Sequence, residues 1–344
     1  MNIDKIIAGP DPSANDATLG ANDSDAEVTY AKVMARVAGQ RATNPRVRRR
    51  VFAGTGVFAV AAAVATVVAV SFGSVGPATP VAGAAVLNHL ATHIKANATT
   101  TPLPGDATLV LRTQSYPDGT SNSEADLYAD NGEYFSTPTE DGLPAAIADN
   151  ANIGNGFTAR EIKAALDAVD GNLATAVQEM ATAPFDNGVK PANTGAAVSA
   201  LKQKIDAQTN LTTAQKAALL QKIIGEANSP SGQQASTDNY IWMDSMDTLI
   251  EGAGNPDVRI GVLRILSTLS EVAVTNTTTN GQPTITLTAS APALPSNYQE
   301  AITINASTGV PVSFAGGTPG QTPSVTVSYQ VSRVTMANIA AGDF

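Results

Sequence analysis

Residues 273–331 read AVTNTTTNGQPTITLTASAPALPSNYQEAITINASTGVPVSFAGGTPGQTPSVTVSYQV, a series of short β-branched or alternating segments separated by turn residues. We expect strands at 273–275, 284–289, 300–304, 310–315 and 324–331. Asn280-Gly281 and Thr308-Gly309 lie where hairpin turns belong, because asparagine and glycine tolerate positive φ angles. The last third of the chain is therefore predicted to form an antiparallel meander.

A second group of strands is predicted earlier in the chain, at 107–116, 124–128 and 133–136, with Asp130-Asn131-Gly132 as the turn between the last two. Between these strands and the meander the pattern is helical, from 157 to about 270. Strands, then helices, then a meander predict the α+β class. We expect an antiparallel, half-barrel-like sheet with a helical insertion at about 157–270.

The helical insertion shows three signals. Thr158-Ala159-Arg160-Glu161 matches a capping box, which predicts a helix start. Asp170-Gly171-Asn172 interrupts the helical pattern and predicts a break, while Asn255-Pro256 predicts the start of a later helix. The apolar residues after the capping box are expected to form one buried stripe, made of Ile162, Leu166, Val169, Leu173, Val177 and Met180.

Residues 51–72 read VFAGTGVFAVAAAVATVVAVSF and contain no charged residue. A helix of this length spans roughly 33 Å, enough to cross a hydrocarbon core of about 30 Å. We therefore predict a transmembrane helix, with a buried core helix as the alternative. A Gly/Pro/Ser linker at 73–80 follows, and a domain at 81–344 begins with an amphipathic helix near 81–96.

An arginine cluster sets the predicted orientation. Arg46, Arg48, Arg49 and Arg50 directly precede the apolar stretch, and no cation follows it before Lys95. The positive-inside rule then places a largely disordered tail, residues 1–50, in the cytoplasm and the domain outside the cell membrane. We expect an uncleaved signal anchor that contacts the lipid bilayer through 51–72. A cleaved signal peptide is the alternative, but its apolar region is normally shorter.

The net charge of −10 is distributed unevenly along the chain. Residues 1–50 carry a charge of +2, whereas the part from Lys95 onward has 12 basic and 24 acidic residues, a charge of −12. An acidic domain argues against a nucleic-acid partner. The chain has no Cys, which excludes a disulfide framework, a thiolate zinc site and an iron–sulfur cluster.

Residues able to carry chemistry are few. His89 and His93, four apart on one predicted helix, are the only weak candidates for metal ligands, and the metalloprotease motif is absent because position 90 is Leu. The carboxylate pairs Glu124 with Asp126, and Asp244 with Asp247, are expected to lie on solvated faces. No nucleophile elbow, phosphate-binding loop or dinucleotide motif occurs. We therefore expect a non-enzymatic protein without a cofactor.

One segment suggests an apolar pocket. Residues 240–246 bring together the single Trp and two of the six Met, and soft apolar side chains can line an adaptable lipid-type pocket. The predicted lining residues are Tyr240, Trp242, Met243 and Met246. Ordinary core where a helix meets the sheet is the interpretation that we favour for this segment, with the apolar pocket as the alternative.

Three segments carry a family resemblance: residues 45–50 before the span, Asp257–Leu266, and Ile304–Val312. With these the chain resembles an uncharacterised family of actinobacterial single-pass membrane proteins with an extracytoplasmic α+β domain. The last segment looks like the family's D-x-x-T-G-x-P hairpin, with Asn305 where Asp is usual. The element order is also similar to that of periplasmic lipoprotein carriers, whose curved half-barrel holds acyl chains. The resemblance implies no catalytic residue.

The sequence thus predicts a membrane-anchored extracytoplasmic binding or interaction protein, whose ligand is an apolar or cell-envelope molecule or a partner protein. The alternative is a membrane-spanning signalling regulator that couples the outer domain to a cytoplasmic partner, as anti-sigma factors do. The zinc-binding version is excluded because residues 1–50 contain neither His nor Cys.

Overall fold

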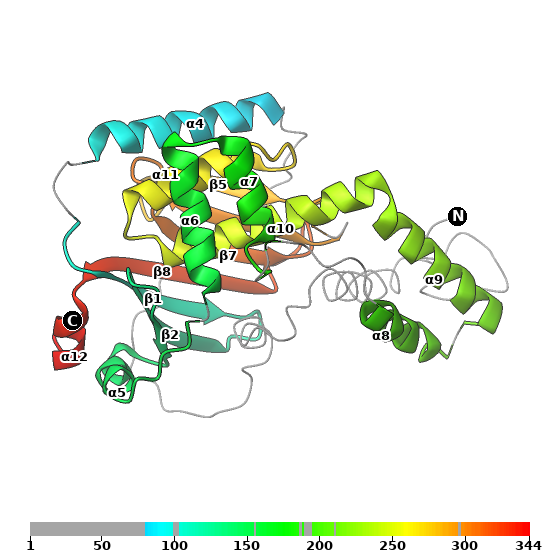
Figure 1. Cartoon of the computed structure of the whole chain (residues 1–344), viewed down its shortest axis with the longest axis horizontal. Coiled ribbons are helices and arrows are strands. Elements are labelled where there is room, and N and C mark those ends of the chain that lie inside the picture. Colours follow the sequence, from blue (N-terminus) through cyan, green and yellow to red (C-terminus); the bar gives the residue numbers. More distant parts are fainter. Residues whose placement is uncertain are drawn as a thin grey trace. The chain divides into compact units, whose positions relative to one another are not determined.

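The computed structural model describes residues 80–98, 103–154, 156–185, 188, 195–209, 211–294 and 297–344. Helices and strands follow one another in three blocks (Figure 1). The first is α4 (Pro80–Asn97), β1 (Ala107–Ser115), β2 (Ser121–Ala129), β3 (Tyr134–Thr137), η2 (Glu140–Gly142) and α5 (Leu143–Ala148). The second is α6 (Phe157–Asp170), α7 (Leu173–Thr182), α8 (Gly195–Asp206), α9 (Thr213–Asn228), α10 (Pro230–Glu251) and α11 (Pro256–Leu266). The third is β4 (Ala273–Thr279), β5 (Gln282–Ala289), β6 (Gln299–Asn305), β7 (Pro311–Gly317), β8 (Val325–Val334) and α12 (Met336–Ala341).

All eight strands belong to one open antiparallel sheet in the order β3-β2-β1-β8-β7-β6-β5-β4. The early and late strands are two meanders, and the pairing of β1 with β8 joins them across the whole helical block. The α+β class and the antiparallel sheet predicted from the sequence are confirmed. Asn280 and Gly281 form the predicted β4–β5 turn, with φ angles of 52° and 77°.

The two faces of the sheet differ. One face carries the apolar side chains of β5 and β6, including Leu287 and Ile302, and these pack with residues of α4, α6, α7, α10 and α11 in the main core. Figure 1 shows α6 and α7 in front of the strands, with α4 running across the upper ends of these two helices. The opposite face is packed at β1–β3 by α5 and α12, through a smaller cluster that includes Phe135, Leu143 and Ile339.

The predicted stripe on α6 and α7 is confirmed except at Leu166: Val169 and Met180 are buried, and Ile162, Leu173 and Val177 are partly buried against the main core. Leu166 is 40% exposed, whereas Ala164, Ala165 and Ala168 are buried. The reason is the close approach of α11, where a Cβ atom on Gly261 would lie 1.7 Å from the carbonyl oxygen of Ala165. A face of alanines admits a glycine-bearing helix at this distance, and a face of leucine and isoleucine would not.

The predicted capping box is also wrong. α6 begins at Phe157 after Gly156, which takes a left-handed conformation and makes no side-chain cap. Thr158 and Glu161 are instead buried inside the helix. The predicted break is confirmed, because α6 ends at Asp170 and the Asn172 side chain caps α7. Asn255 caps α11 as expected.

The chain divides into two compact units, and the larger one holds the sheet with its covering helices. Residues Pro191–Ser236 belong to the smaller unit. There α8 and α9 share a separate small core, and Thr212 with Gln215 forms a capping box at the start of α9. The buried residues of this core are Leu201, Ile205, Leu211, Leu219 and Ile223.

The predicted span at 51–72 and the arginine cluster at 46–50 lie outside the described residues. Among the helices that the structure does describe, none combines the length and the apolar character needed to cross a bilayer.

Candidate functional site

The four residues predicted to line an apolar pocket all lie on α10. Tyr240, Trp242 and Met246 are buried, and Met243 is partly buried against the main core. Trp242 has no exposed surface and belongs to the same core cluster as Leu287 and Ile302 of the sheet. In this structure the four side chains therefore fill the space between α10 and its neighbours.

A buried carboxylate accompanies the tryptophan. The indole Nε1 of Trp242 donates a hydrogen bond to Oε2 of Glu300 at 2.8 Å. Glu300 lies on β6 in phase with Ile302 and Ile304, on the face that the helices cover. Sequence reasoning missed this residue, although a glutamate in phase with buried isoleucines is the signal that would have revealed it. The bond satisfies the only polar atom of the tryptophan side chain.

A tyrosine stands two residues before each partner of this hydrogen bond: Tyr240 before Trp242, and Tyr298 before Glu300. Tyr240 meets Phe185 edge to face, with ring centroids 5.3 Å apart. Burial and the nearby Glu300 carboxylate raise the pKa of Tyr298 well above its usual value. This part of the core is rich in aromatic groups and contains a charge, which distinguishes it from a purely aliphatic packing layer.

A second polar cluster lies on β1, β2 and β3. Arg112 forms ion pairs with Glu124 and with Asp126, whose Oδ2 lies 2.8 Å from the arginine Nε. Ser136 donates a hydrogen bond to Glu124 at 2.7 Å, and Tyr134 donates one to Asp126 at 2.7 Å. The expectation that Glu124 and Asp126 lie on a solvated face is wrong, because Asp126 is buried and Glu124 is partly so.

Two stacked tyrosines complete this cluster. The rings of Tyr128 and Tyr134 are 4.6 Å apart and nearly parallel, and they pack with Ile250 of α10. Burial, and then the negative charge of Asp126, raise the pKa of both hydroxyls well above the usual value. Glu251 adds to the shift at Tyr128, which places the end of α10 beside the ion pairs. The cluster thus joins the outer strands to α10.

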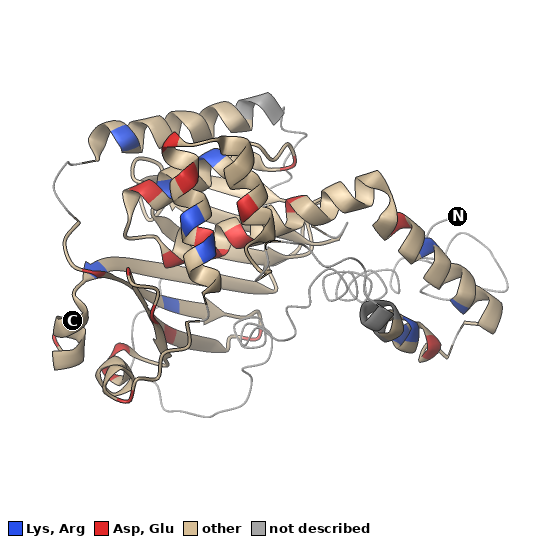
Figure 2. Ribbon diagram, viewed as in Figure 1, with Lys and Arg blue, Asp and Glu red and all other residues tan. Residues whose placement is uncertain are grey.

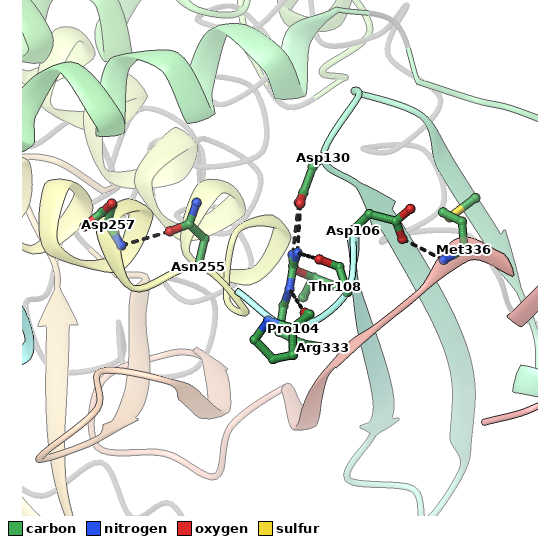
Figure 3. A network of polar contacts seen from close by, with 9 residues as sticks. Pro104, Asp106, Thr108, Asp130, Asn255, Asp257, Arg333 and Met336 are labelled. Atoms are coloured by element: carbon green, nitrogen blue, oxygen red, sulfur yellow. Dashed lines mark hydrogen bonds and ion pairs between the residues drawn. The ribbon is translucent and has the colours of Figure 1, made fainter. Parts of the chain in front are cut away.

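Arg333 on β8 forms a third network (Figure 3). Its guanidinium donates to both carboxylate oxygens of Asp130 at 2.9 and 2.8 Å, to Thr108 Oγ1 at 3.2 Å, and to the carbonyl oxygens of Pro104 and Gly105 at 3.2 and 3.0 Å. An arginine has five N–H donors, and these five contacts use all of them. Arg333 therefore clamps the start of β1 to the β2–β3 turn and keeps no donor for a ligand.

A buried arginine connects two of the segments that carry the family resemblance. Arg259 on α11 donates from Nε to the carbonyl oxygen of Thr308 in the β6–β7 turn at 2.8 Å, and it also donates to the carbonyl of Ala253. Burial lowers the pKa of Arg259 to about 10. In the same turn, Asn305 Oδ1 accepts the backbone N–H groups of Ser307 and Thr308. Arg259 therefore ties α11 to the β6–β7 turn.

His89 and His93 lie on the exposed face of α4. His93 has Asn97 as a neighbour on the next turn of the helix. Within the described part of the chain, no three His, Asp or Glu side chains are arranged to hold a metal ion. Of the other carboxylate pair, Asp244 is buried inside α10 and Asp247 is half-buried.

A surface hollow of about 330 Å³ lies where α6 ends and α7 begins. Its acidic residues face lysines, since Asp167 pairs with Lys163 and Asp170 pairs with Lys95. Figure 2 shows acidic and basic positions interspersed along α6. The hollow is lined by Leu166, Asp167, Asp170, Gly171, Asn172 and Thr175.

Comparisons of the chain with protein-family models, with curated proteins and with solved structures found no match. The function must therefore be inferred from the residues of this chain. Arg112, Arg333 and Glu300 each bond to partners within the fold, which makes all three polar networks packing elements of an α+β domain. The residues predicted to line an apolar pocket differ from these networks, because they lie on α10 and most of them pack in the main core.

Proposed function

We propose that the protein is a membrane-anchored extracytoplasmic binding protein. The observation that carries the proposal is the charge pattern: no charged residue occurs from Val51 to Ile94, and four arginines stand directly before this stretch. Residues 51–72 cross the membrane, residues 1–50 remain in the cytoplasm, and the domain that begins near residue 81 lies outside. Its helix α4 begins at Pro80, the last residue of the predicted linker.

The orientation is tested with reporter fusions in cells, one after residue 45 and one after residue 120. A reporter active only in the cytoplasm should work in the first fusion, and one active only outside should work in the second. Replacing Arg46, Arg48, Arg49 and Arg50 by Asn should weaken this asymmetry, because the arginines hold the tail inside. Activity of both reporters in the same compartment would contradict the anchor.

The ligand that we propose is an apolar molecule of the cell envelope, held between the helical layer and a half-barrel-like sheet. Two features support this class. The helix-facing surface of β5 and β6 is apolar apart from Glu300, and α10 presents Met243, which is only partly buried, beside Trp242. A flexible thioether next to an aromatic ring can re-pack around an apolar chain. Binding then requires α10 to move away from the sheet.

The single tryptophan provides the test. Because Trp242 is the only Trp and is buried beside Glu300, its fluorescence reports any ligand that enters there. The full chain purified in detergent is analysed by native mass spectrometry and then titrated with a long-chain fatty acid. We expect a bound apolar molecule and a change in tryptophan emission that Met243→Ala weakens. Leu166→Ala, at an exposed position on α6, is the matched control.

Absence of a bound molecule together with unchanged emission would contradict the apolar ligand. The signalling alternative is addressed by pull-down with residues 1–50 as bait. A specific cytoplasmic partner would favour that alternative, whereas capture of none leaves the tail with a topogenic role.

A further inference from the structure

The two edges of the sheet are built differently. The β3 edge is short, with four residues, and it is covered. Ile153 donates its N–H to the carbonyl of Tyr134 at 2.9 Å, and Asn152 Oδ1 accepts the N–H of Tyr134 at 3.1 Å. The β4 edge is seven residues long, and Thr275, Asn276, Thr277 and Thr278 are all exposed. No described strand pairs with its outer side.

The register of the β4–β5 hairpin shows which backbone groups face outward. Thr279 and Gln282 flank the two-residue turn and therefore form a hydrogen-bonded pair. Counting back in steps of two, Thr277 and Thr275 also bond to β5. The alternate residues Val274, Asn276 and Thr278 then direct their N–H and C=O groups away from β5. No backbone hydrogen bond from the described part of the chain reaches that side.

Helix α4 packs against Val272 and Val274 at the beginning of β4, but the exposed residues Thr275–Thr278 carry none of the usual features that protect an edge strand. Natural edge strands are usually protected by lysines, prolines, bulges or short length, because free strand edges recruit other strands. The seven residues Ala273–Thr279 include no charged residue and no proline, and the pairing with β5 runs without a register shift. One edge of the sheet is covered and the edge at the opposite end is not, which indicates that the uncovered edge binds another strand.

Threonine hydroxyls connect this edge to the sheet. Thr277 Oγ1 lies 2.9 Å from Thr284 Oγ1 and 3.0 Å from Thr286 Oγ1, and Thr286 in turn lies 3.0 Å from Thr303. The hydroxyls thus form a ladder across β4, β5 and β6, on the face opposite the main core. At β4 the ladder ends on Thr277, which is exposed, and on Thr279, whose Oγ1 lies 3.1 Å from that of Thr284.

We propose that a second copy of this chain pairs with β4, strand against strand and antiparallel, around a two-fold axis at Asn276. In this register Asn276 lies opposite Asn276 of the other copy, and Val274 lies opposite Thr278. About six backbone hydrogen bonds form between the two copies. Thr275 then faces Thr277 of the other copy, which continues the hydroxyl ladder. Self-pairing brings no like charges together, because the strand is uncharged.

The first test changes the charge at the two-fold axis. The full chain in detergent is examined by sedimentation as wild type, as Asn276→Lys and as Asn276→Asp. We expect a dimer for the wild type and monomers for both variants, since each places like charges opposite one another. A mixture of the two variants should restore a dimer. Gln330→Lys, at an exposed position on β8 away from the edge, is the control and should remain dimeric.

The second test uses the absence of Cys from the chain. Paired residues at a hydrogen-bonded position lie about 5.5 Å apart between Cα atoms, within the range for a disulfide. Asn276→Cys should therefore form a crosslinked dimer on mild oxidation, and Gln330→Cys should not. A monomeric wild type would overturn the proposal, and so would a dimer that persists in Asn276→Lys. Strand addition by an extended peptide of another protein would then be the competing use of the edge.

Discussion

The two ends of the eight-stranded sheet are stabilised by different chemistry. At the β3 end, charged side chains are paired: Arg112 with Glu124 and with the buried Asp126, and the largely buried Arg333 with the exposed Asp130. At the β4 end, strands β4, β5 and β7 carry no charged residue, and the one carboxylate of β6, Glu300, accepts a hydrogen bond from Trp242; threonine hydroxyls and aliphatic side chains replace the ion pairs. The charged end is closed to partners by its own contacts, whereas the uncharged end keeps free backbone groups.

The two ends therefore differ in how strictly their contacts require one arrangement of the strands. An ion pair between buried groups fixes one arrangement, because any other arrangement leaves a charge without compensation. A hydroxyl ladder and an open strand edge are satisfied equally well by water, by a second copy or by a peptide. The charged end therefore holds the body together, and the hydroxyl end is available for association.

The largest expected effect is at the charged end. Arg112→Met should lower the free energy of unfolding by about 3 kcal/mol, at the low end for a broken buried pair because Glu124 is partly open to water. Lys163→Met is the matched control, since Lys163 also meets two carboxylates but is exposed, and it should cost less than about 1 kcal/mol. Urea unfolding measures both. Equal losses would remove the distinction between buried and exposed pairs.

High pH should also weaken the charged end. The pKa values of Tyr128 and Tyr134 are raised in the folded state, so the fold keeps protons that the unfolded chain releases near pH 10. Stability is therefore full below pH 10 and falls above it, by about 1.4 kcal/mol per pH unit for each tyrosine. Tyr134→Phe should flatten this fall. Tyrosinate absorbance that develops at pH 10 in the folded wild type for all seven tyrosines would contradict the assignment.

The smallest effect is expected on the hydroxyl ladder. Thr286→Val keeps the β-branched shape and removes the contacts to Thr277 and Thr303, so it should cost less than about 1 kcal/mol. Thermal unfolding of the full chain in detergent measures it. A loss as large as that of Arg112→Met would show that the hydroxyl end is as rigidly specified as the charged end.

The sequence predicted the strands and their turns well, because alternation and Asn-Gly dipeptides are local signals. It failed where packing partners decide the outcome. On α6 the exposure of Leu166 and the burial of the alanines were not foreseen, because the glycine that sets this contact, Gly261, lies on another helix. Arg112 and Glu300 were missed because their partners, on β2 and α10, are distant or unremarkable in the sequence. A hydrophobic pattern indicates which residues share a face, but it does not indicate which distant residue will pair with a buried polar side chain.

Amide hydrogen exchange along β4 tests most directly whether the β4 strands of two copies pair. Because Thr275 and Thr277 bond to β5 and Asn276 and Thr278 face outward, an isolated copy should show alternating protection along the strand. In the paired wild type we predict protection at all four amides, and alternation should return in Asn276→Lys. The protection of the Tyr134 amide, at the covered β3 edge, should be the same in the wild type and in Asn276→Lys. Alternating protection in the wild type at every protein concentration would contradict the account.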